Sequence, residues 1–133
     1  EKVAEPIVEE GHADVLIAFE KLEAMRYAHF LKKDGVIIAN DQRIDPITVV
    51  TGQAEYPDHI LETLSEKHKV ISIDAMAEAK KLGNPKVFNT IIIGVAAKHM
   101  DFDHDKWVEV IKATVPPKTV EMNLKAFEVG YAL

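Results

Sequence analysis

The sequence contains no cysteine. Without thiolates this chain cannot supply a cysteine nucleophile, a thiolate zinc site or the ligands of an iron–sulfur cluster. If the protein takes part in redox chemistry, the redox centre must therefore be held by another chain.

Long apolar runs and runs of basic residues are also missing. No apolar stretch approaches the ~20 residues that span a bilayer, and the first ten residues do not resemble a secretory signal. Lys and Arg number 16 against 22 Asp and Glu, a net charge of −6, and no basic block could neutralise a row of phosphates. We therefore expect a cytoplasmic protein that binds neither membranes nor nucleic acid.

Glycine and serine motifs of catalysis are absent as well. The six glycines form neither G-x-G-x-x-G nor a Walker A loop, so no phosphate-binding loop is visible. Neither Ser65 nor Ser72 lies in a G-x-S-x-G motif. The sequence thus gives no indication of a serine hydrolase.

One short segment is rich in potential metal ligands. Lys106 stands where a calcium loop needs glycine, and Lys112 stands where it needs glutamate. His99 and His104 also lack the i, i+4 spacing of a helical zinc site. We interpret the segment as a solvated loop that caps a helix, and predict no metal site. Its ligand-type residues are His99, Asp101, Asp103, His104 and Asp105.

Apolar runs of strand length recur along the chain. Residues 13–19 are almost continuously apolar without alternation, which is typical of a strand buried on both faces of a parallel sheet. Similar runs predict strands at 36–39 and 70–73. A short edge strand is predicted at 47–50, and residues 1–10 are expected to form an extended edge or connecting segment.

Helices are predicted between and after these strands. Ala24, Tyr27, Ala28 and Leu31 form one apolar stripe, which predicts a helix from Glu20 through Lys33. Gly35 is expected to stop this helix in a left-handed conformation, and Asp58 is expected to cap the next one. The segment 87–100 could be strand or helix, and its length favours helix. The later helices are predicted at 58–67, 76–82, 87–100, 103–114 and 121–131, and Trp107, Val110, Ile111 and Thr114 are expected to share one face.

This alternation of strands and helices predicts the fold class. We expect a single α/β domain over residues 1–133, built as a Rossmann-like three-layer sandwich with a mostly parallel sheet. The carboxyl ends of parallel strands meet at one edge, where ligands of this class bind. The polar residues at those ends are Glu20, Asn40, Asp41 and Asp74. The simpler interpretation of these residues is that they cap helices at the surface.

Three apolar residues lie off the stripe of the first predicted helix. Leu22, Met25 and Phe30 fall outside the spacing that faces the core. Either a second element covers this helix, or the helix presents apolar surface to a partner chain.

Four segments together resemble one protein family. Residues 1–27, 36–41 (VIIAND), 89–94 (NTIIIG) and 123–130 (NLKAFEVG) are similar to the small, beta or gamma, subunit of 2-oxoacid:ferredoxin oxidoreductases, in particular of the indolepyruvate-specific enzymes. The similarity extends over the whole chain. Family members begin with a strand–helix unit carrying a G-x-G-G-Q-G turn, which does not precede Glu1, so the chain is expected to be the later part of the family's domain.

The resemblance implies a function. The chain would be a subunit of an enzyme that oxidatively decarboxylates aryl 2-oxoacids such as indolepyruvate with coenzyme A, yielding acyl-CoA, carbon dioxide and reduced ferredoxin. Thiamine diphosphate and the iron–sulfur clusters would be held by a large partner subunit, ferredoxin would be reached through the complex, and the isolated chain would be inactive.

The resemblance also gives the residues candidate roles. Coenzyme A, a co-substrate, would be contacted by Glu20, Asn40, Asp41 or Asp74, because they lie at the strand ends. Leu22, Met25 and Phe30 would lie at the subunit interface. The alternative is a free-standing α/β module that binds a small nucleotide-like ligand in a regulatory role, and a metal-dependent hydrolase is a more distant third.

Overall fold

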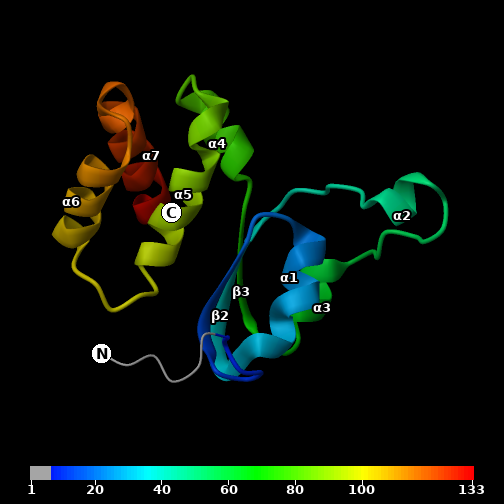
Figure 1. Cartoon of the computed structure of the whole chain (residues 1–133). Coiled ribbons are helices and arrows are strands. Elements are labelled where there is room, and N and C mark those ends of the chain that lie inside the picture. The colour runs from blue at the N-terminus through cyan, green and yellow to red at the C-terminus, as the bar shows by residue number, and fades with distance from the viewer. Residues whose placement is uncertain (1–6) are drawn as a thin grey trace. The chain divides into compact units, whose positions relative to one another are not determined.

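The computed structural model describes residues 7–133, so the expected extended segment at 1–10 lies mostly outside the described residues. The chain folds into two compact units, divided between Ser72 and Ile73 (Figure 1). Across the described residues, no helix has the length and apolar character that crossing a membrane requires.

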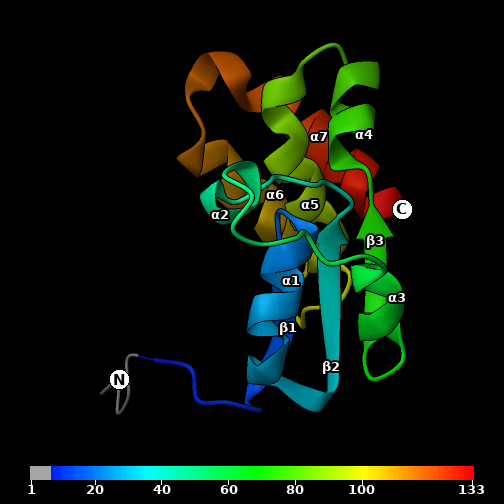
Figure 2. The same cartoon turned by 90° about the vertical axis from the view of Figure 1, so that its right-hand side faces the viewer.

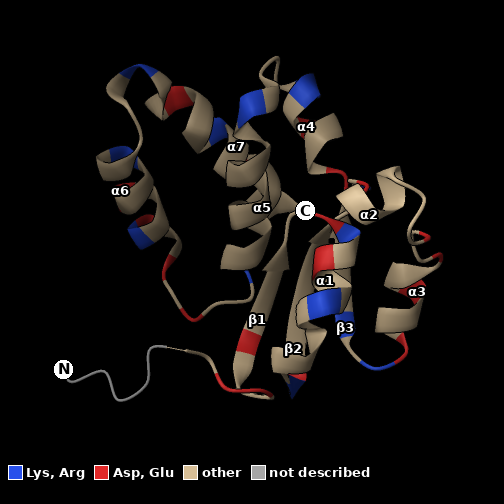
Figure 3. Cartoon of the chain, turned by 45° about the vertical axis from the view of Figure 1, so that its right-hand side comes forward, with Lys and Arg blue, Asp and Glu red and all other residues tan. Residues whose placement is uncertain are grey.

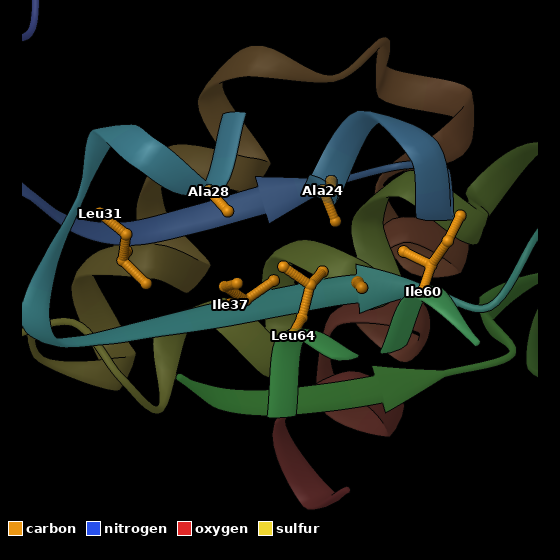
Figure 4. Packing of buried hydrophobic residues seen from close by; sticks show 8 residues of the cluster. Ala24, Ala28, Leu31, Ile37, Ile60 and Leu64 are labelled. Carbon is orange, nitrogen blue, oxygen red and sulfur yellow. The ribbon is translucent and has the colours of Figure 1, made fainter. Parts of the chain in front are cut away.

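The first unit is built on a parallel sheet. Its strands are β1 (Ala13–Ala18), β2 (Leu31–Asn40) and β3 (Lys69–Ile73), in the order β1-β2-β3. β1 and β2 pair in parallel, and the three arrows in Figure 4 point the same way. The helices α1 (Lys21–Tyr27) and α3 (Ile60–Ser65) lie on one side of the sheet (Figure 2). The predicted α/β fold with a parallel sheet is confirmed.

The core of this unit lies between the sheet and the two helices (Figure 4). α1 contributes only small side chains, Ala24 and Ala28, which let its backbone approach the strands closely. Each large buried aliphatic side chain stabilises the fold by about 1.5–3 kcal/mol through the removal of apolar surface from water. The buried members of this cluster are Ala18, Ala24, Ala28, Leu31, Ile37, Ala39, Ile60 and Leu64.

The strand that is buried on both faces is β2 rather than β1. Ile37 and Ile38, which point to opposite faces of the sheet, are both fully buried. Val15 and Ile17 in β1 are only partly buried. The burial expected for residues 13–19 is therefore wrong for β1, because β1 lies at an edge of the sheet among the described strands.

The helix predicted from Glu20 to Lys33 is too long. α1 ends at Tyr27, a 3-10 turn covers Ala28–Phe30, and β2 already begins at Leu31. Leu31 pairs with Ala13, and its side chain enters the core from the strand. Tertiary packing thus prevails over the helical spacing of the stripe.

Gly35 does not stop a helix. It lies inside β2, where the pairing with β1 is irregular between Ala13 and Val15, and its φ is not positive. A Cβ at this position would come within 2.6 Å of the Leu31 Cγ. Glycine is required because the irregular strand folds back against the Leu31 side chain.

Lys32, in the same stretch, pairs with Asp14 of β1. The hydrogen bond and the charge of the Lys32 ammonium lower the pKa of the Asp14 carboxyl.

The edge strand predicted at 47–50 is also wrong. These residues form the short helix α2 (Ile47–Val50), which begins directly after Pro46. Pro46 is the N-cap, with an extended ψ of 159°, and the Val49 and Val50 N–H groups donate to its carbonyl oxygen. Ile47 and Val50 are exposed, so the β-branched pattern reflects surface residues rather than a buried strand. The next helix is capped at His59 in a left-handed conformation, φ 54°, and not at Asp58 as predicted.

The second unit is helical. It contains α4 (Ala75–Lys81), α5 (Phe88–Ala97), α6 (His104–Thr114) and α7 (Val120–Ala132), with 3-10 turns before α5 and α7. The four predicted helices are confirmed, including the ambiguous segment 87–100. The stop at Gly83 is confirmed by its φ of +82°.

α5 and α7 cross with their backbones in close contact. A Cβ on Gly94 would lie 2.3 Å from the Phe127 carbonyl oxygen, and one on Gly130 would lie 1.9 Å from the Ile91 carbonyl oxygen. No side chain fits between the two helices at this crossing. The adjoining cluster is built around buried Phe127, with Ala97 and Ile111.

The crossing makes a prediction about Gly130→Ala in this protein. Helix propensity alone would raise the free energy of unfolding by about 1 kcal/mol. Overpacking against a backbone carbonyl should instead give a net loss of about 2 kcal/mol or more. Chemical denaturation measures the sign, and Lys125→Ala, on an exposed side chain of α7, serves as the control with a change of less than about 0.5 kcal/mol. A Gly130→Ala variant more stable than wild type would contradict the close crossing.

Candidate functional site

Glu20 lies at the carboxyl end of β1 and is almost entirely buried, 6% exposed. Its Oε2 accepts hydrogen bonds from the backbone N–H groups of Leu22 at 2.8 Å and Glu23 at 3.2 Å, which caps α1. Its Oε1 accepts a hydrogen bond from the Ile44 N–H at 3.3 Å and one from the Tyr56 hydroxyl. A buried carboxylate needs such partners, and here both oxygens have structural ones.

Tyr56 completes this arrangement from the loop before α3. Burial, and then the hydrogen bond to Glu20, raise the pKa of Tyr56 above its usual value. The phenol therefore stays protonated and donates to the carboxylate. The Arg43 guanidinium lies over the Tyr56 ring, with Cζ 4.4 Å from the ring centre.

Asn40, the last residue of β2, joins two strand ends. Its side chain is 1% exposed, and Nδ2 donates to the Phe19 carbonyl at 3.2 Å and to Gln42 Oε1 at 3.0 Å. The Lys21 backbone N–H donates to the Gln42 carbonyl at 3.1 Å. These bonds fix the course of the chain where it leaves β2.

A pocket of about 240 Å³ lies beside these strand ends, within the first unit. Asp41, exposed after β2, pairs with the Lys21 ammonium at 2.9 Å. The Arg43 guanidinium pairs with Asp45 at 2.6 Å, which raises the pKa of Arg43 further. Acidic and basic ribbon segments meet near the amino end of α1 (Figure 3). The lining residues are Lys21, Asp41, Arg43, Tyr56, Pro57, Asp58, His59, Ile60, Leu61 and Glu62.

The lining is suited to a polar ligand of mixed chemistry. Lys21 and Arg43 offer cationic donors for a phosphate or carboxylate. Asp41 can accept hydrogen bonds from amino or hydroxyl groups. The stacked Arg43 and Tyr56 provide a flat surface of the kind on which planar rings bind. Cations and carboxylates nearly balance, so the pocket has no strong single-sign field.

The strand-end residues predicted from the sequence are thus only partly brought together. Asp41 lines the pocket. Glu20 and Asn40 do not line it. Glu20 accepts a hydrogen bond from the lining residue Tyr56, and Asn40 donates one to Gln42, which lies between the lining residues Asp41 and Arg43 in the chain. Asp74 belongs to the second unit, where its Oδ1 accepts a hydrogen bond from the Ala77 N–H at 2.8 Å and caps α4. Helix capping accounts for the side-chain contact of Asp74, whereas Glu20 caps α1 through Oε2 and also accepts hydrogen bonds from Ile44 and Tyr56 through Oε1.

Sequence reasoning missed Lys21, Arg43 and Tyr56 as pocket residues. A usable signal was present, because the loop between the end of β2 and α3 carries cationic and aromatic residues on the side of the sheet where ligands of this class bind.

The three interface candidates occupy different environments. Leu22 packs against the core of the first unit and is partly buried. Met25 is 38% exposed. Phe30 is half-buried and stacks with Tyr27, the ring centres being 6.1 Å apart.

The acidic segment before α6 does not assemble a metal site. Over residues 7–133, no group of three or more histidine, aspartate or glutamate side chains is placed to hold a metal ion. His104 Nε2 instead lies within hydrogen-bond distance of Glu128 Oε1, at 2.9 Å. The His104 ring also contacts the rings of Phe127 and Tyr131. Asp103 occupies the predicted cap position of α6, but its side chain makes no capping hydrogen bond.

A parallel sheet with a polar pocket beyond the carboxyl ends of its strands is the arrangement in which α/β proteins commonly bind ligands. The chain belongs to the pyruvate ferredoxin/flavodoxin oxidoreductase family, whose sequence model matches residues 1–133. The resemblance inferred from the sequence is confirmed at this level.

Curated relatives narrow the similarity further. The chain is 38% identical to the indolepyruvate oxidoreductase subunit IorB of Thermococcus kodakarensis, over 98% of this chain and 67% of that protein. It is 39% identical to the subunit of the same name from Pyrococcus horikoshii, over 93% of this chain and 64% of that protein. The chain therefore spans about two thirds of the length of these relatives.

A solved structure shares the fold. The gamma subunit of a keto/oxoacid ferredoxin oxidoreductase from Geobacter sulfurreducens superposes with a TM-score of 0.67 at 20% identity. The match covers 95% of this chain and 66% of that one. At this identity the comparison establishes the fold alone.

The Glu20 hydrogen bonds make a prediction about stability. Glu20→Ala should lower the free energy of unfolding of the full-length subunit by about 2–4 kcal/mol, because it removes a helix cap and leaves the Tyr56 hydroxyl and the Ile44 N–H without their acceptor. Glu23→Ala, in an exposed ion pair three residues away, is the matched control and should change it by less than about 0.5 kcal/mol. Equal stability of the two variants in chemical denaturation would contradict the role assigned to Glu20.

The raised pKa of Tyr56 predicts a pH dependence. Because the folded protein favours the protonated phenol, the stabilising contribution of the hydroxyl is complete below pH about 10, the ordinary pKa of tyrosine, and is lost as the pH rises further. The difference in free energy of unfolding between wild type and Tyr56→Phe should therefore be constant from pH about 7 to about 9 and shrink above about 10. Urea denaturation of both proteins at each pH measures it. A difference that grows in alkali would contradict the assignment.

Proposed function

We propose that this chain is a subunit of a complex that oxidatively decarboxylates aryl 2-oxoacids such as indolepyruvate. The reaction converts the 2-oxoacid, coenzyme A and two oxidised ferredoxins to acyl-CoA, carbon dioxide, a proton and two reduced ferredoxins. The observation that supports this most directly is the identity of 38% over 98% of the chain with a subunit named for indolepyruvate oxidation.

The chemical steps of this reaction belong to a large partner subunit in this proposal. The chain has no cysteine to bind iron–sulfur clusters, and the described residues gather no set of metal ligands, so its own residues do not fit these groups. Bound to the partner, thiamine diphosphate would supply the decarboxylation chemistry and the clusters would carry electrons to ferredoxin. The isolated chain is therefore expected to be inactive.

The contribution of this chain is to bind coenzyme A. Lys21 and Arg43, which line the pocket beside β1 and β2, would contact phosphate oxygens, and the Arg43–Tyr56 stack would receive the adenine ring. Asp41 can accept hydrogen bonds from an amino or ribose hydroxyl group. Glu20 and Asn40 position the pocket wall through Tyr56 and Gln42. Asp74, predicted from its place after β3, does not line this pocket and is not assigned a coenzyme A contact in the proposal.

The proposal is tested by reconstituting the full-length subunit with the large partner subunit of the same organism. Reduction of viologen with indolepyruvate should require both chains and coenzyme A, and pyruvate serves as the comparison substrate. If no complex forms and no reduction occurs, the proposal fails. Tight binding of a nucleotide to the subunit without any partner would then favour a free-standing regulatory module.

The proposed pocket predicts the effect of Arg43→Ala on the complex. Loss of one charged hydrogen-bond donor to coenzyme A should raise KM for coenzyme A about tenfold, with little change in kcat. Arg26→Ala is a matched control, because Arg26 is equally exposed at 51%, forms a similar ion pair with Glu23 and does not line the pocket. Steady-state kinetics measure both variants. A KM equal to that of Arg26→Ala would remove Arg43 from the site.

A further inference from the structure

The second unit carries an apolar patch that its own core does not use. The patch is formed by Phe102, Trp107 and Val110, together with the stem of Lys106, and encloses a pocket of about 210 Å³. Phe102 is 67% exposed and Val110 is 58% exposed. The space is sufficient for one aliphatic or aromatic side chain of another molecule.

The patch exists because α6 has two apolar faces. Ile111 is buried and Val108 packs against the same cluster, which is the face that an amphipathic helix normally presents to its core. Val110, expected from the sequence to share the face of Ile111, instead points away with Phe102. A surface helix of this length would ordinarily carry polar residues there.

Trp107 links the two faces. Its ring stacks on Phe127 in the core, with centres 6.3 Å apart, and meets the edge of Phe102 at 6.0 Å on the other side. The tryptophan is therefore held rigidly while part of it borders the open pocket. Rigid, partly buried aromatic residues are enriched at the energetic centres of protein interfaces.

The surroundings of the patch are acidic. Asp101 and Asp103 flank Phe102 in the chain, and Asp105 follows in the first turn of α6. Among residues 7–133, these three carboxylates form no ion pair with a lysine or arginine, whereas Lys106, the one charged lining residue, is paired with Glu109. The charge close to the pocket is therefore mainly negative, which is complementary to a surface that carries an apolar side chain beside basic ones.

We propose that this patch, defined by Phe102, Trp107 and Val110, is a docking site for a basic, apolar-bearing segment of the large partner subunit. The occupant is a different chain rather than a second copy, because this chain carries a net charge of −6 and two copies of the same face would oppose their carboxylates. The proposal rests on the proposed function for the existence of the partner. It assigns the contact to residues of α6 that the coenzyme A pocket does not include.

The test measures the dissociation constant between the full-length subunit and the large subunit. Val110→Ser and Phe102→Ala should each raise Kd by about tenfold or more, because interface hot-spot residues contribute on this scale. Val50→Ser is the matched control, since Val50 is the same residue type, is 68% exposed on α2 and lies outside the patch. Its Kd should stay within about twofold of wild type. Thermal melting of each variant confirms that these exposed substitutions leave the fold intact.

A charge test addresses the acidic surroundings separately. The double variant Asp101→Asn with Asp103→Asn should raise Kd by about threefold to tenfold at low salt, and the difference from wild type should disappear as salt screens the charges. An equal effect at all salt concentrations would contradict the basic character of the occupant.

The outcomes distinguish this proposal from the proposed function. If wild-type subunits do not associate, the proposed function fails. If they associate and the patch variants bind with wild-type Kd, or Val50→Ser weakens binding equally, the docking site is overturned while the proposed function stands. The docking site would also be overturned if the patch variants changed only KM for ferredoxin or only abolished self-association of the small subunit. Either result would assign the patch to another occupant.

Discussion

The first unit depends on a buried carboxylate that must be fully hydrogen-bonded. Glu20 ends β1, starts α1 and accepts hydrogen bonds from the loop after β2, so one side chain joins three parts of the chain that are far apart in sequence. Leaving such a group without partners in the interior would cost more than each hydrogen bond gains. The hydrogen bonds from Ile44 and Tyr56 to Glu20 therefore hold the loop between β2 and α3 against the strand ends. Arg43 and Tyr56 line the pocket as a consequence.

The sequence predicts helices and strands correctly where the spacing of apolar residues matches the face that packs against the core. The three strands and the helices of the second unit follow from runs and spacings that also face a core. The prediction fails around Leu31, whose helical spacing with Ala24 and Ala28 is real but whose side chain reaches the same core from a strand. It fails again at Ile47–Val50, where β-branched residues occur without a sheet to receive them. In both places, local pattern carries no information about the partner surface.

The candidate site shows the same division. The strand-end rule identifies Glu20, Asn40 and Asp41 from the order of strands and helices alone. It does not reveal which of them is enclosed, because burial depends on the loop that folds over them, and that loop has no periodic pattern. Arg43 and Tyr56 both line the pocket, and they come from well-separated positions in the loop, with the Arg43 guanidinium over the Tyr56 ring. Such a contact is set by the folded loop rather than by its sequence spacing.

The glycine crossing of α5 and α7 has a consequence for biosynthesis. α5 leaves the ribosome before α7, and its backbone at Gly94 and Ile91 is shaped to receive a helix that has not yet been made. Until α7 emerges, the face of α5 that it covers, almost entirely aliphatic, remains exposed to water and to other nascent chains. In the interval between the synthesis of the two helices, the nascent unit exposes apolar surface that the folded protein buries, and such surface favours aggregation.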